Sequence, residues 1–219
     1  MSPQTFRDQL LDKILTLLWR HWSALGVLGE SEGEDDRVLD PEALVVFSLD
    51  IARYEPRLFD EILRWIMVNG ELLDTARIKS LVQDRLAQRD VSFACLVSAV
   101  FQWISTQSNQ RKWETLVGSC RKIIMQTPSV AKNEALFMDK SGDPHPMVHE
   151  HNADEIFLGF HLNRPKVALE KKGRVAPVNA GTNLRFLLRA LFGIGSRSEC
   201  ILYLLTHDGG RPKEIADAT

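Results

Sequence analysis

The chain has 219 residues, of which 44% are hydrophobic and 26% are charged, and its formal net charge is −2. This balance is ordinary for a globular protein and excludes a chain that is disordered throughout. No apolar run approaches the roughly 20 residues that a membrane span needs, and the acidic side chains Asp8 and Asp12 near the N-terminus are atypical of a targeting peptide, so the sequence predicts a cytoplasmic protein with no membrane partner.

Helix signals follow one another through residues 1–125, which we expect to form a self-contained helical domain. Ser2-Pro3 and Asp40-Pro41 each place a capping side chain before a proline at the first helical position, and Pro56 opens another helix. The expected helices cover residues 3–25, 42–54, 57–70 and 72–86, a segment capped by Asp90, and residues 111–125. The side chains expected to be buried include Phe6, Leu10, Ile14, Leu17, Leu18, Ile78, Leu81, Val82, Leu86, Phe93, Leu96, Val97, Val100, Phe101, Ile104, Trp113, Leu116, Val117, Cys120 and Ile124.

Residues 126–182 lack helical periodicity and contain five of the nine prolines. The stretches "ALFM" (135–138) and "EIFLGFHL" (155–162) are candidates for short strands. Because so long an irregular stretch is uncommon inside a compact domain, we expect a connector that lies over the helices with few apolar anchors.

Helical signals return in residues 183–219. "NLRFLLRALFGIG" predicts a helix that ends at its glycines, and Ser196 with Glu199 has the spacing of a capping box for the next helix. In that helix Ile201, Leu204 and Leu205 are expected to be buried. "HDGG" then predicts a turn before a short helix over residues 211–218.

The stretch "ILYLLTHDGGRPKEIADAT" (201–219) resembles the first two helices of the winged-helix domain of bacterial helix-turn-helix regulators. The resemblance implies a mainly α protein in which a recognition helix and a wing would follow. It therefore predicts a piece of a DNA-binding transcriptional regulator that lacks its recognition helix and acts on DNA in its full-length form, as a homodimer or with a partner protein. Three basic residues are expected to contact the DNA backbone, namely Arg197, Arg211 and Lys213.

The charge distribution fits this interpretation. Residues 1–60 hold twelve acidic and six basic side chains, whereas residues 164–219 hold ten basic and five acidic ones. A basic segment is typical of a surface that faces nucleic acid, although a solvated surface with uneven charge has the same composition.

Other interpretations stay open. The chain could be a protein-interaction or antitoxin-like module that does not bind DNA directly. Residues 51–81 could themselves be a helix-turn-helix, with "LLDTARIKSLV" (72–82) as the start of a recognition helix that carries Arg77, Lys79 and Arg85.

The sequence offers little evidence for a metal site or a catalytic site. The loop "DPHPMVHEHNADE" (143–155) gathers three histidines and four acidic residues, yet a solvated loop explains it better than a metal site. No nucleophile with a matched base and no phosphate-binding glycine motif is present, so we expect neither an enzyme nor a cofactor. Cys95 and Cys120 lie in apolar helical runs and are expected to be buried thiols.

Overall fold

The computed structural model describes residues 2–27, 37–88, 90–126, 133–147, 152–168 and 173–218, and the protein is mainly α-helical. In chain order the elements are α1 (Pro3–Ala24), α2 (Pro41–Ile51), η1 (Ala52–Tyr54), α3 (Pro56–Asn69), η2 (Gly70–Leu72), α4 (Thr75–Ala87), α5 (Val91–Ser108), η3 (Arg111–Trp113), α6 (Glu114–Met125), β1 (Glu134–Ala135), α7 (Glu155–Leu158), β2 (Leu162–Asn163), η5 (Gly181–Asn183), α8 (Leu184–Phe192), α9 (Ser196–Thr206) and α10 (Pro212–Ala218). Within these ranges, no helix combines the length and the hydropathy that crossing a bilayer takes.

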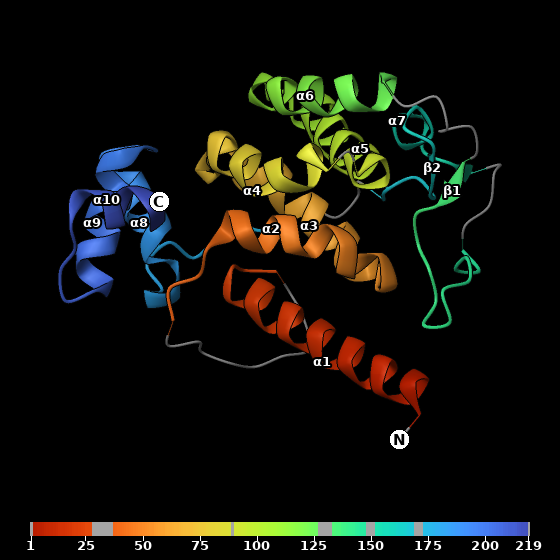
Figure 1. The fold of residues 1–219 in the computed structure, drawn as a ribbon, viewed down its shortest axis with the longest axis horizontal. Helices are drawn as coiled ribbons and strands as arrows, with labels where there is room; N and C mark the ends of the chain where they lie inside the picture. Colours follow the sequence, from red (N-terminus) through yellow and green to blue (C-terminus); the bar gives the residue numbers. More distant parts are fainter. Residues whose placement is uncertain are drawn as a thin grey trace.

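The elements form a helical body with a smaller group of elements at each end (Figure 1). Helices α2 to α6 make up the body, and α1 runs along one side of it. The two short strands and α7 lie at one end of the body, and α8, α9 and α10 lie at the opposite end. The two groups that follow α6 in the sequence are therefore separated in space by the helices that precede them.

The helix starts predicted from capping residues are confirmed. The side chains of Ser2, Asp40 and Asp90 accept the backbone N–H groups of the third residue beyond each of them, at 3.1, 3.0 and 3.0 Å. Each cap satisfies an amide that has no partner within its own helix, which is why the signal is readable from local sequence. Helix α3 ends at Asn69, but the chain continues into η2 because Gly70 keeps a right-handed conformation.

Helix α5 lies at the centre of the hydrophobic core. It contacts α2, α3, α4, α6 and α7. Its six side chains that were expected to point inward are all buried. The ring of Phe101 stacks on that of Trp113 from η3, with centroids 4.9 Å apart. A helix that is apolar on nearly all sides needs neighbours on every side, and the surrounding helices supply them.

The expected burial along α1 is wrong for part of the helix. Phe6, Leu10 and Leu17 are exposed, whereas Leu15 and Trp22 are buried. The α1 helix packs on α2 near its C-terminal end and diverges from the body toward its N-terminus (Figure 1). The stripe at helical spacing is real, but the packing partner of α1 covers a neighbouring face. On other helices, Leu81 is exposed and Ile124 is partly buried.

Residues 133–147 and 152–168 contribute side chains to the same core as the helices. β1 pairs with β2 in parallel, so the expected strands exist only in part, and residues 155–158 form the helical turn α7 instead. The buried apolar side chains of this stretch are Leu136, Phe137, Ala153, Phe157, Phe160, Leu162 and Val167. The expectation of few apolar anchors is therefore wrong.

Arg164 is the polar centre of this end of the protein. Its side chain is 1% exposed and its Nη2 lies 2.7 Å from Oδ1 of Asp60 on α3. Its guanidinium also lies over the rings of Phe137 and Phe157, at 5.2 and 5.1 Å from their centroids. Burial lowers the pKa of Arg164, against the opposing effect of Asp60. A charge this deeply buried needs its partner, so Arg164 ties β2 to α3.

Both cysteines expected in the core are buried there, Cys95 on α5 and Cys120 on α6. Burial raises the pKa of each thiol to about 11. Both are therefore protonated at neutral pH, the state in which a thiol is a poor nucleophile and a poor metal ligand.

Two phenylalanines test this account of the core. Phe101→Ala removes a fully buried ring and should lower the free energy of unfolding by about 3–5 kcal/mol. Phe6→Ala removes the same atoms from an exposed site on α1 and should change it by less than about 0.5 kcal/mol. Urea unfolding followed by circular dichroism measures both. Equal losses in the two variants would show that α1 is packed differently.

Candidate nucleic-acid interface

Helices α9 and α10 are joined by an ordered turn. The ring of Tyr203, in the last part of α9, stacks on His207 with centroids 4.0 Å apart. Nδ1 of His207 lies 3.0 Å from both the carbonyl oxygen of Tyr203 and Oγ1 of Thr206. A Cβ atom on Gly210 would lie 2.5 Å from the Tyr203 ring, and Gly209 has a φ of +142°. The turn therefore depends on both glycines and on the stacked pair.

The three basic residues predicted to contact DNA are all exposed. Arg211 and Lys213 lie together at the start of α10. Arg197 lies in the first turn of α9, and a helix rises about 1.5 Å per residue, so it is about 14 Å along the axis from the end at which α10 begins. The structure thus brings two of the three residues together and leaves the third at the far end of α9.

The start of α10 is less favourable to phosphate than the sequence indicates. The Glu214 carboxylate accepts the backbone N–H of Arg211 at 2.7 Å. This is the glutamate half of a capping box, and it places a negative charge at the helix N-terminus, where backbone amides would otherwise favour an anion. Any phosphate contact in this region therefore depends on the side chains of Arg211 and Lys213.

The capping box expected at the start of α9 does not form. Gly195 is the N-cap of α9 and no side chain caps the helix. Ser198 donates its hydroxyl to the carbonyl of Gly195, and Glu199 is buried against Arg189 of α8. The expectation is wrong because a tertiary ion pair, which sequence spacing cannot show, takes the carboxylate away from the helix end.

A buried ion-pair cluster holds α8 and α9 on the body. Arg189 has a side chain that is 1% exposed, and it donates to Glu42 of α2 at 2.6 Å and to Glu199 of α9 at 2.7 Å. It also donates to the carbonyl of Leu72 at 2.8 Å. Glu42, which is 0% exposed, further accepts the backbone N–H of Asp74, the N-cap of α4, at 2.8 Å. Helices α2, α4, α8 and α9 and the turn η2 therefore converge on one guanidinium and one carboxylate.

Arg185, one turn before Arg189, extends the cluster. Its Nη1 lies 3.0 Å from Glu199, and its Nη2 lies 3.9 Å from Asp40, which Arg77 of α4 contacts at 2.5 Å. Burial lowers the pKa of Arg189, but its hydrogen bonds and charge interactions with Glu42 and Glu199 outweigh burial, so the pKa is raised. Three cationic and three anionic side chains make the cluster neutral as a whole.

Asp40 makes part of the stability that the cluster contributes dependent on pH. Burial raises the pKa of Asp40, but the hydrogen bond from Arg77 and the charge of Arg185 outweigh burial, so the pKa lies below its ordinary value. Its contribution to stability is complete above the unfolded-state pKa of about 3.9 and is lost as the pH falls through the lowered value.

Because of this cluster, fewer of the basic residues in 164–219 lie at the surface than the sequence indicates. Arg185 and Arg189 are neutralised inside the protein, and Arg164 is paired with Asp60 in the core. The surplus of positive charge in residues 164–219 is therefore smaller at the surface than in the sequence. The electrostatic case for DNA rests on the exposed side chains alone.

The apolar face expected on α9 is turned outward. Leu202 is buried and Ile201 is partly buried, but Leu204 and Leu205 are 55% and 62% exposed. The end of α8 and the following loop add further exposed apolar side chains, Leu191, Phe192 and Ile194. This end of the protein therefore presents apolar surface that no described element covers.

The alternative helix-turn-helix, expected in residues 51–81 with Arg85 at the end of its second helix, does not supply a comparable surface. Of the three basic residues expected there, Arg77 pairs with Asp40, and Arg85 pairs with Asp50 and Asp90. Of the three, Lys79 is the one in the exposed class. The alternative helix-turn-helix therefore lacks a basic face.

The histidine-rich loop is described only in part, because residues 148–151, with two of its three histidines, lie outside the described residues. Asp154 caps α7 and accepts the indole N–H of Trp103 at 3.1 Å. In the parts of the chain that the structure covers, no group of three or more His, Cys, Asp or Glu side chains is arranged to hold a metal ion.

Comparisons of the chain with protein-family models, with curated proteins and with solved structures found no match. The likeness to a winged helix therefore depends on the residues of α9, the turn and α10.

The cluster makes a direct prediction. Arg189→Ala leaves Glu42 and Glu199 buried without their partner, so the free energy of unfolding should fall by about 3–5 kcal/mol. The matched control is Arg197→Ala, an exposed arginine on the adjacent helix, with an expected change within about 0.5 kcal/mol. Urea unfolding measures both.

The triple variant Glu42→Gln/Arg189→Met/Glu199→Gln separates charge from packing. It removes the two carboxylates that Arg189→Ala leaves without their partner, keeps most of the volume and leaves Asp40 beside Arg185, so it should regain part of the stability lost in Arg189→Ala. An Arg189→Ala variant as stable as the Arg197→Ala control would contradict the role given to the cluster.

Proposed function

We propose that the chain is part of a DNA-binding transcriptional regulator and that α9, the turn and α10 are the part of its helix-turn-helix that contacts the DNA backbone. The observation that carries the proposal is the pair of helices joined by a turn built on Tyr203, His207 and two glycines, with Arg211 and Lys213 exposed at the start of the second helix. In this role the protein binds and is not an enzyme.

The exposed residues of α10 suit contacts that position the protein on the DNA backbone, and they do not suit the reading of base edges. In helix-turn-helix proteins, contacts from flanking residues to phosphate set the register, and a recognition helix in the major groove reads the bases. The resemblance puts that helix after the one that α10 matches. Residues 1–219 alone should therefore bind DNA weakly and without sequence preference.

A mobility-shift series tests this. A random 30-bp duplex is titrated with the chain at several salt concentrations, and the affinity should fall steeply as salt rises. Arg211→Ala/Lys213→Ala should reduce the slope of log K against log salt by about 0.9 for each phosphate that the variant no longer neutralises. Lys79→Ala/Lys122→Ala removes two exposed charges from α4 and α6 and is the control, with no change expected in the slope. Absence of a shift at low salt, or equal effects of the two pairs, would overturn the proposal.

A second function is favoured by the exposed apolar side chains at the same end of the protein. If Leu191, Phe192, Leu204 and Leu205 mark a contact for another protein or a second copy, the chain is an interaction module. Sedimentation at increasing concentration should then show self-association, or a monomer that binds a partner through this end.

The test of that contact is Leu204→Glu/Leu205→Glu. Both side chains are largely exposed, so the fold should persist while association is abolished. Association that survives this change, with Phe6→Glu as a control at an exposed apolar site on α1, would place the contact elsewhere.

A further inference from the structure

Helix α2 is apolar on nearly all sides, yet one strip of it is open to water. Its sequence, PEALVVFSLDI, contains two charged residues, Glu42 and Asp50. Helices α1, α3, α4 and α5 pack on it. Among residues 41–51, all of which the structure describes, Phe47 alone is exposed, at 48%. An aromatic ring is therefore left in water on a helix whose composition is that of a fully covered one.

Helix α5 is equally apolar, and it is covered. Helices α2, α3, α4, α6 and α7 contact it, and its large apolar side chains from Phe93 to Ile104 are buried. The strip of α2 at Phe47 differs because none of the described residues supplies the corresponding neighbour. A further apolar surface would complete the packing of α2 in the way that the chain itself completes that of α5.

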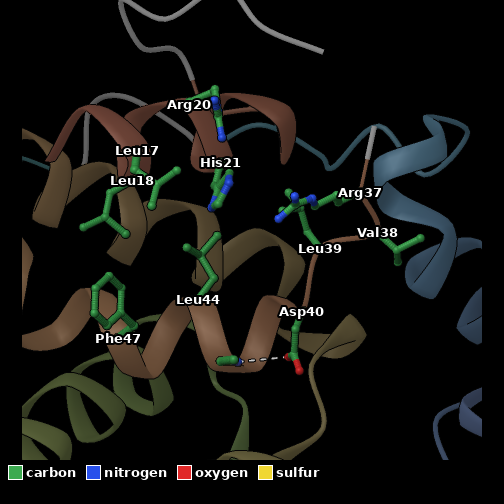
Figure 2. Close-up of a pocket in the computed structure, with 11 residues that line it drawn as sticks. Leu17, Leu18, Arg20, His21, Arg37, Val38, Leu39, Asp40, Leu44 and Phe47 are labelled. Atoms are coloured by element: carbon green, nitrogen blue, oxygen red, sulfur yellow. Dashed lines mark hydrogen bonds between the residues drawn. The ribbon is translucent and has the colours of Figure 1, made fainter. Parts of the chain in front are cut away.

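Phe47 lies between two hollows. The larger hollow, toward α1, has a volume of about 740 Å³, and the smaller one, toward α4, about 290 Å³. Ala43 and Phe47 line both of them, and Figure 2 shows Leu17 and Leu18 of α1 above Phe47. A cavity of about 150 Å³ is enough to hold benzene, so either hollow has room for a phenyl ring. This face therefore carries an apolar knob and, directly beside it, room for such a knob.

The charged groups around the two hollows already have partners within the chain. Arg85 contacts Asp50, and Asp40 contacts Arg77. The basic residues of the larger hollow also interact with other groups of the chain, namely Arg20, His21 and Arg37. A surface that covers this face therefore has no counter-charge to supply, which favours an apolar partner.

We propose that this face of α2 binds a second copy of the chain, with Phe47 of each copy seated in the larger hollow of the other. An interface between two identical copies related by a two-fold axis must be complementary to itself. A knob beside a hollow that accepts it meets this condition. A buried aromatic ring in a pocket is also the usual centre of a protein interface.

The area of the contact sets its strength. Leu17, Phe47 and Leu81 are 39%, 48% and 38% exposed. At about half exposure each leaves on the order of 100 Å² of apolar surface in water. Since a little over half of a typical interface is apolar, the two copies would bury about 1,000 Å² in total, the lower limit of a specific interface. The dimer is therefore weak and forms as the protein concentration rises.

Sedimentation velocity on residues 1–219 at increasing concentration measures the dissociation constant of the dimer. Phe47→Glu should raise it about tenfold or more, because it places a charge in an apolar hollow. Phe6→Glu is the matched control, since Phe6 is 55% exposed and lines neither hollow, and it should leave the constant unchanged. A monomer at every concentration, or a dimer that Phe47→Glu does not weaken, would overturn the proposal.

Ala43→Trp tests the seat of the knob. It keeps Phe47 and fills the hollows that Ala43 lines, so it should weaken the dimer as Phe47→Glu does. Circular dichroism establishes that both variants are folded. A dimer of unchanged strength in folded Ala43→Trp would show that Phe47 does not enter the hollow.

Two other results would replace this contact. A dimer broken by Leu204→Glu/Leu205→Glu and not by Phe47→Glu would place the contact at α9. A monomer that binds 1-octanol, and loses it in Phe47→Glu, would replace the second copy with a small apolar ligand. None of these results bears on the DNA experiment, which depends on α10.

Discussion

The full burial of the Glu42 carboxylate on α2 is the constraint on which the positions of α4 and α8 depend. A carboxylate without water is stable only with a cation and hydrogen-bond donors around it. Glu42 obtains the cation from Arg189 on α8 and an N–H from Asp74 at the start of α4. Its own position in the first turn of α2 adds the favourable end of a helix dipole. The start of α4 and the position of α8 are therefore set by the N–H and the cation that Glu42 requires.

An ion-pair cluster holds α8 and α9 differently from an apolar interface. Apolar contact is nondirectional, so a helix held by it can slide or rotate at little cost, whereas a guanidinium shared between two carboxylates fixes both the position and the rotation of its helix. Leu188 and Leu202 are buried, but Leu191, Leu204 and Leu205 are left exposed. The polar cluster thus fixes this end of the protein although several of its apolar side chains stay exposed.

Local signals predicted the helices well, because caps such as Asp40 and Asp90 act within three residues. The apolar pattern also placed α5 in the core, since a helix that is apolar on nearly every side has few other places to lie. The predictions that are wrong concern contacts between helices, which local sequence does not show. Glu199 has capping-box spacing but faces Arg189, and Phe6 lies on an apolar stripe but is exposed. Of the candidate site, exposure of Arg211 and Lys213 was predictable, whereas the burial of Arg189 was not, because its partner Glu42 lies on α2, far away in the sequence.

Residues 37–40 line a groove between α1 and α2 and also reach the end of the protein that carries α8. Leu39 lines the groove and donates its N–H to the carbonyl of Thr182, just before α8, at 2.9 Å. Asp40, the next residue, interacts with Arg77 and Arg185. Because the same short segment lines the groove and reaches the buried cluster, a displacement of residues 37–40 would act on the Leu39–Thr182 hydrogen bond and on the ion pairs of Asp40.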